Sequence, residues 1–120
     1  LFLLALPSAA LSETRTISWD PVTTYTDGTP IEPEKTVSYI MYWSINISLS
    51  PLTSLGSAVT ATSTTFDPTI QGMFRGSTVY FTGKAFLNTG EESALSPAYP
   101  WLVPPSRQPG APTMESATPQ

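Results

Sequence analysis

Hydrophobic and polar positions alternate with a period of two along much of the chain. The stretch Thr14–Trp19 (TRTISW) places Arg15, Ile17 and Trp19 on one side and hydroxyl-bearing residues on the other, which predicts a half-buried strand. The stretch Val37–Ile47 (VSYIMYWSINI) is apolar or aromatic at both sets of positions. That pattern is typical of a strand at the centre of a sheet.

Four more stretches are predicted as strands: Leu52–Gly56, Val59–Phe66, Thr78–Leu87 and Glu92–Pro104. Prolines interrupt the last of them, so we expect it at a sheet edge. Gly83 interrupts the third, which indicates a bulge or a group packed closely over the glycine, or else a slightly weakened strand. No stretch keeps a period of 3.6 residues, and about seven short strands predict an all-β antiparallel sandwich.

The pattern divides the chain into three parts. Residues 1–12 form an apolar N-terminal segment, residues 13–103 the predicted domain, and residues 104–120 a tail rich in proline. We expect the tail to be an extended linker or arm, because proline removes backbone donors and large apolar side chains are nearly missing from it.

The N-terminal segment, LFLLALPSAALS, has two interpretations. It matches the end of a secretion signal, with an apolar run followed by small residues where a signal peptidase cuts. It also fits an extended strand of the mature chain. The apolar run is too short to span a bilayer, which takes about 20 residues. Both interpretations predict an exported, extracellular protein.

Composition narrows the classes of function. The net charge is −4 with only five Lys and Arg in 120 residues, which argues against nucleic acid and anionic membranes as partners. The chain has no Cys and no His, so disulfides, thiolate metal sites and the commonest general base are excluded. We therefore expect no enzymatic activity and no cofactor.

The acidic residues give a weak signal for chemistry. Glu32 and Glu34 form one pair and Glu91 and Glu92 another, but both pairs lie in predicted turns, and catalytic carboxylates need a cleft that excludes water. We expect surface charge at these positions. Calcium binding by Asp27 with Glu32 or Glu34 is an alternative whose spacing matches no known ion loop.

Three separated blocks carry a resemblance to a known family. They are TISWDPV (Thr16–Val22), SYIMYWS (Ser38–Ser44) and GSTVYFTGKAFLNTGEESALS (Gly76–Ser96). In this order they resemble the fibronectin type III domains found in secreted bacterial proteins, over about residues 13–103. The resemblance implies an immunoglobulin-like antiparallel β-sandwich with extended N- and C-terminal arms.

The resemblance also gives the N-terminal segment a role. The first strand of that sandwich should precede Thr14, and only Leu1–Ser12 are available for it. If these residues are removed, one sheet keeps an exposed edge that invites a strand from a neighbour. If they are retained, they close their own sheet or insert into the next subunit.

Two sets of residues are candidates for binding. The predicted partner-binding residues are Leu1, Phe2, Leu3, Leu4, Leu6 and Trp101, and the candidate sugar platform is Tyr25, Tyr42 and Trp43. Against the platform, alternate residues of Val37–Trp43 are expected in the core together with Trp19.

The favoured function is a structural or protein-interaction module of an extracellular assembly, a fibre subunit or decoration joined through its terminal arms. The alternative is a carbohydrate- or surface-adhesion domain with exposed aromatic residues.

Overall fold

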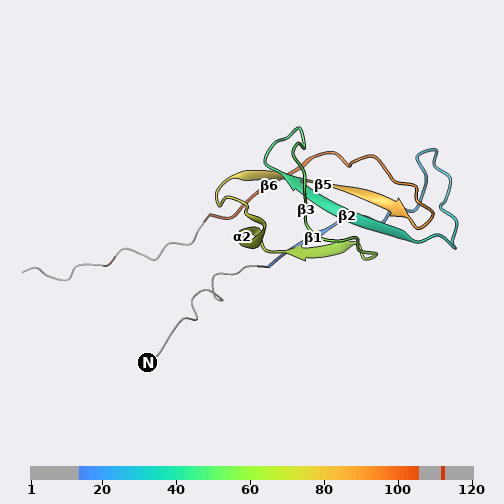
Figure 1. Ribbon diagram of the computed structural model, residues 1–120, viewed down its shortest axis with the longest axis horizontal. Helices are drawn as coiled ribbons and strands as arrows, with labels where there is room; N and C mark the ends of the chain where they lie inside the picture. The colour runs from blue at the N-terminus through green and yellow to red at the C-terminus, as the bar shows by residue number, and fades with distance from the viewer. Residues whose placement is uncertain (1–13, 106–111, 113–120) are drawn as a thin grey trace, which may run out of the picture.

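The computed structural model describes residues 14–105 and residue 112, and they form an all-β fold of two antiparallel sheets (Figure 1). The smaller sheet pairs β1 (Arg15–Ser18) with β4 (Ser63–Phe66). The larger sheet has the order β3-β2-β5-β6 and contains β2 (Val37–Ser44), β3 (Thr53–Ser54), β5 (Thr78–Leu87) and β6 (Tyr99–Leu102). The predicted all-β class with antiparallel strands is confirmed.

The larger sheet is built on a long ladder between β2 and β5. These strands pair from Val37↔Leu87 to Ser44↔Tyr80 without interruption. Because β2 lies between β3 and β5, its predicted central position is confirmed, and the predicted edge position of the proline-containing last strand is confirmed for β6.

The stretch Val59–Phe66 does not form one strand as predicted. Val59 bridges Tyr39 of the larger sheet, whereas β4 pairs with β1 of the smaller sheet. The chain therefore crosses between the two sheets within this stretch. The strands predicted at Leu52–Gly56 and Glu92–Pro104 are likewise shorter, as β3 and β6.

One short helix, α2 (Pro68–Gln71), follows β4 and was not predicted. Asp67 caps it by accepting hydrogen bonds from the backbone of Thr69 and Ile70, and Gly72 ends it in the left-handed conformation at φ 84°. Aspartate before proline and glycine after the last turn are ordinary helix boundary signals. A single turn is too short to produce the periodicity on which the prediction relied.

Aromatic and branched side chains from both sheets form the core. It comprises Trp43, Phe66, Met73, Val79, Phe81 and Val103, with Ile17, Leu55 and Trp101 packed against it. The Phe66 ring of β4 lies edge-on to the Phe81 ring of β5, with centroids 5.4 Å apart. The two sheets thus pack on each other through aromatic contacts. The expected alternation in β2 is confirmed, since Tyr39 and Trp43 are buried and Tyr42 is half-buried.

Two parts of the predicted organisation lie outside the described residues. They are the apolar segment 1–12, with the candidate partner residues Leu1, Phe2, Leu3, Leu4 and Leu6, and the tail beyond residue 105 apart from residue 112.

Candidate interaction groove

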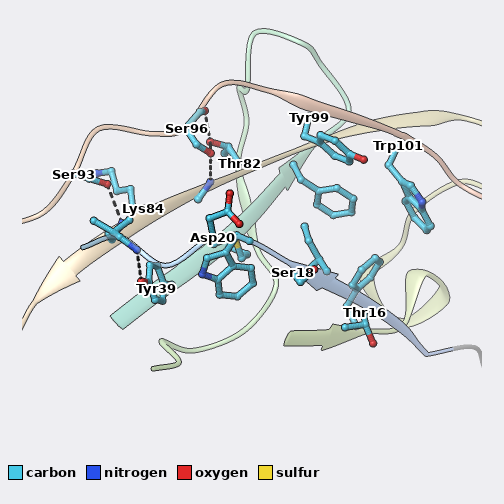
Figure 2. Close-up of a pocket in the computed structure, with 18 of the residues that line it drawn as sticks. Thr16, Ser18, Asp20, Tyr39, Thr82, Lys84, Ser93, Ser96, Tyr99 and Trp101 are labelled. Atoms are coloured by element: carbon cyan, nitrogen blue, oxygen red, sulfur yellow. Dashed lines mark hydrogen bonds between the residues drawn. The ribbon is translucent and has the colours of Figure 1, made fainter. Parts of the chain in front are cut away.

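A cavity of about 880 Å³ separates β1 from β5, β6 and the segment that joins them. The β1 side contributes Thr16, Ile17, Ser18 and Trp19, and the opposite side contributes Phe81, Ser93, Ser96, Tyr99 and Trp101. Figure 2 shows Thr16 and Ser18 on one side of this space and Tyr99 and Trp101 on the other. We call this space the β1 groove.

The alternation of β1 sets which side chains line the interior of the groove. Arg15, Ile17 and Trp19 are half-buried, whereas Thr14, Thr16 and Ser18 are exposed, as the pattern of TRTISW predicts. Trp19 was expected in the core, but it is half-buried at the groove, with its ring edge-on to Tyr39 at 5.5 Å. Its buried indole nitrogen has no hydrogen-bond partner among the described residues.

One backbone edge of β1 is unpaired in the described part of the chain. The Trp19 amide donates to the Thr62 carbonyl at 2.9 Å, on the side of β4. Alternate residues of an antiparallel strand bond to the same neighbour, so Thr16 and Ser18 direct their N–H and C=O groups away from β4. Within residues 14–105 no strand pairs with this second edge of β1.

On the opposite wall of the groove, two serines form hydrogen bonds with the backbone of β5. Ser96 accepts from the Gly83 amide at 3.0 Å, and Ser93 accepts from the Ala85 amide at 2.9 Å. The backbone amides of the same serines donate to the carbonyls of Gly83 and Ala85. The serine hydroxyls therefore satisfy the β5 amides in place of a further strand (Figure 2).

Trp101 connects the groove to the core. Its ring lies 5.5 Å from Phe66 and 5.7 Å from Phe81, and it is half-buried. The side chain also lines the groove. A partner seated there would therefore meet a tryptophan whose position is fixed by core packing.

A tyrosine holds the chain at the end of β1. The hydroxyl of buried Tyr39 accepts a hydrogen bond from the Val22 amide at 2.9 Å. This contact fixes the segment after β1 against β2, and with it the far end of the groove. The sequence did not single out Tyr39 for this purpose.

The three aromatic residues predicted as a sugar platform do not lie on one face. Trp43 is only 7% exposed and its indole nitrogen donates to the Gln71 side chain at 3.0 Å. Tyr42 is the preceding residue of the same strand, so it faces the opposite side of the sheet. Tyr25 lies in a separate loop, where its hydroxyl donates to Glu32. Strand alternation and burial therefore separate the three residues of the candidate platform.

Tyr25 belongs to a small ionic cluster at the surface. Lys35 Nζ lies 3.0 Å from the Tyr25 hydroxyl and 3.7 Å from carboxylate oxygens of both Glu32 and Glu91. The hydrogen bond from Tyr25 lowers the pKa of Glu32 and is the first cause of that shift. The contact with Tyr25 is likewise the main reason that the pKa of Lys35 is raised.

The other acidic residues show no arrangement suited to catalysis. The pairs Glu32 and Glu34, and Glu91 and Glu92, are exposed as predicted. Asp27 accepts from the amide and hydroxyl of Thr29, which lowers its pKa. In the part of the chain that the structure describes, no three His, Cys, Asp or Glu side chains are placed to hold a metal ion.

No protein-family model matches this chain, and neither does any curated protein. Among the described helices, none has the length and apolar character needed to cross a membrane.

Several lining residues of the groove were not predicted as site residues. Ser93, Ser96 and Tyr99 come from the last predicted strand, Glu92–Pro104, which was expected at a sheet edge because prolines interrupt it. No local pattern indicated the two serines, because their hydroxyls accept from the amides of Gly83 and Ala85, which are distant in the sequence.

Proposed function

We propose that this chain is a non-enzymatic structural module of an extracellular assembly, a fibre subunit or decoration joined to its neighbours through its terminal arms. The proposal includes a fibronectin type III-like sandwich whose first strand is supplied by the apolar N-terminal segment. The observation that carries it is the edge of β1 with which no strand of residues 14–105 pairs, beside a groove of about 880 Å³.

An unpaired edge next to an apolar groove favours strand addition. Backbone groups of Thr16 and Ser18 supply the ladder, and the side chains of Ile17, Phe66 and Trp101 supply apolar contacts. Together these are the two components of recognition by β-augmentation. The hydroxyls of Ser96 and Ser93 already accept from β5 amides, so an added strand would pair with β1 and not with β5.

The adhesion alternative has less support. It needs coplanar aromatic rings at the surface, and Tyr25, Tyr42 and Trp43 are dispersed over a loop, an outer face and the core. Within residues 14–105, the features that favour assembly, namely the free backbone edge of β1 and the apolar side chains beside it, lie together at the groove.

Sedimentation velocity over a range of concentrations tests the proposed function. The full 120-residue chain is expected to associate, and a chain without residues 1–11 is expected to remain monomeric with folded-like tryptophan fluorescence. The folded core is expected to survive the deletion, because all core residues lie between Ile17 and Val103. A full chain that stays monomeric at every concentration, or intact assembly after the deletion, would overturn the proposal.

A further inference from the structure

We infer that the β1 groove receives residues Leu1–Leu6 of a second copy of this chain, paired antiparallel to β1. This inference rests on the proposed function and specifies its partner. It follows from the edge chemistry, from the composition of the segment and from the register that a connection within one chain would impose.

The edge of β1 is better suited to pairing than the edge of β6. Antiparallel pairing of β6 with β5 places Tyr99 opposite Phe81 and Trp101 opposite Val79. Pro100 has no N–H to offer on the free edge, so a strand added to β6 would lose a ladder hydrogen bond. The outward-facing residues of β1, Thr16 and Ser18, both keep their donors.

Trp19, which lines the groove, carries an unsatisfied donor. The Trp19 indole nitrogen is buried and has no acceptor within residues 14–105. A buried N–H without a partner is costly, so a rearrangement of Trp19 that brings its indole nitrogen to an acceptor would be favourable.

The segment Leu1–Leu6 (LFLLAL) matches the groove in composition. It carries no charge and no polar side chain, and as an extended strand it spans roughly 20 Å. The groove walls supply Ile17, Phe66, Phe81 and Trp101 for one face of such a strand. Its other face is equally apolar, which fits a segment buried between two subunits better than an edge strand with one face in solvent.

The register favours a second copy over closure within one chain. β-hairpin connections usually contain two to five residues. A connection of that length before Arg15 would place residues 7–10 opposite Ile17, so Pro7 and the small residues after it would occupy the groove. Most of LFLLAL would then extend past Ser18. A strand from another copy has no such restriction and can place its leucines beside Ile17.

Complementation between two defective variants tests the inference. The donor is the full chain with Thr16→Pro, which removes an outward N–H of β1 while the pairing with β4 is retained. The acceptor is the chain without residues 1–6. Each alone is expected to be monomeric, and an equimolar mixture is expected to form a 1:1 heterodimer in sedimentation velocity.

Thr16→Val is the matched control for the donor, because it keeps the backbone N–H and the β-propensity of the site. It is expected to assemble like the unmodified chain, whereas Thr16→Pro weakens self-association by about tenfold or more. If circular dichroism shows that Thr16→Pro does not fold, Ala94→Trp replaces it, since Ala94 lines the opposite wall and the larger ring narrows the groove.

The possible results of these experiments distinguish the proposed function from the inference that a second copy supplies the strand. A monomeric unmodified chain would refute the proposed function itself. An unmodified chain that assembles while donor and acceptor fail to pair would refute only the inference, and would assign LFLLAL to its own groove or to another surface. Heterodimer formation supports both.

Discussion

The thioether of Met41 lies directly over Gly83, its partner across the β2–β5 ladder. A Cβ atom placed on Gly83 would lie 2.5 Å from Met41 Cε and 2.6 Å from Met41 Sδ. The ladder continues through this pair without a bulge. Of the alternatives for Gly83, the close packing of another group is therefore confirmed.

This contact predicts a graded response to substitution at Gly83. Gly83→Val is expected to lower the free energy of unfolding by about 1–3 kcal/mol, which is typical of overpacking. Gly83→Ala is expected to cost less, because the flexible end of Met41 can turn toward the groove that it lines. Urea unfolding measures both, and Met41→Ala in the same background should reduce the cost of Gly83→Val. A valine variant as stable as the parent would contradict this prediction.

The aromatic contact between the sheets predicts a large loss on truncation of Phe66. Phe66 is 7% exposed and contacts both Phe81 and Trp101. Phe66→Ala is expected to cost about 3–5 kcal/mol of the free energy of unfolding. Phe74→Ala is the matched control, since Phe74 is 74% exposed, and its change should stay within about 0.5 kcal/mol. Equal effects in thermal or urea unfolding would show that the core is placed incorrectly.

The hydrogen bond between Trp43 and Gln71 predicts a requirement for an acceptor in α2. Gln71→Leu would leave the indole N–H of the buried Trp43 without its partner, at a cost of about 1–3 kcal/mol. Gln71→Glu keeps an acceptor oxygen and is expected to retain most of the stability. Denaturant titrations followed by tryptophan fluorescence distinguish the two, and indistinguishable losses would argue against the contact.

The ionic cluster predicts a loss of stability in acid. Tyr25 is the main reason that the pKa of Glu32 lies below its ordinary value of 4.5 in the folded chain. A carboxyl with a lowered pKa stabilises the fold above its ordinary value, and this contribution is lost as the pH falls through the folded value. The stability difference between the parent and Glu32→Gln should therefore be present at pH 7 and shrink below about pH 4.5.

Glu34→Gln is the charge-matched control for this measurement. The readout is the midpoint of urea unfolding, measured once at pH 7 and once below about pH 4.5. The effect should be modest and decrease with salt, because Glu32 is about half exposed. A midpoint difference between parent and Glu32→Gln that does not depend on pH would contradict the assignment.

The sequence predicted the strands well where one strand stays in one sheet. Thr78–Leu87 has the predicted bounds as β5, and the faces of β1 follow the alternation of TRTISW. The strand prediction failed where the chain leaves one sheet and enters the other. Val59 bridges one sheet and Ser63 begins pairing in the other, and local alternation carries no information about such a crossing.

The candidate site was predictable only in part. Trp101 is among the predicted partner-binding residues, and it lies half-buried in the groove. Ser93, Ser96 and Tyr39 could not be assigned from sequence, because their contacts depend on distant backbone groups of Gly83, Ala85 and Val22.

Amide hydrogen exchange at Thr16 and Ser18 tests pairing along β1 most directly. An isotope-labelled chain without residues 1–11 is measured alone and after addition of the unlabelled full chain. Both amides are expected to exchange rapidly alone, since no described strand pairs with that edge. Strand insertion predicts that they become protected when the full chain is added, while the amide of Trp19, already bonded to Thr62, changes little. Unchanged exchange at Thr16 and Ser18 in the presence of the full chain would contradict assembly through the β1 groove.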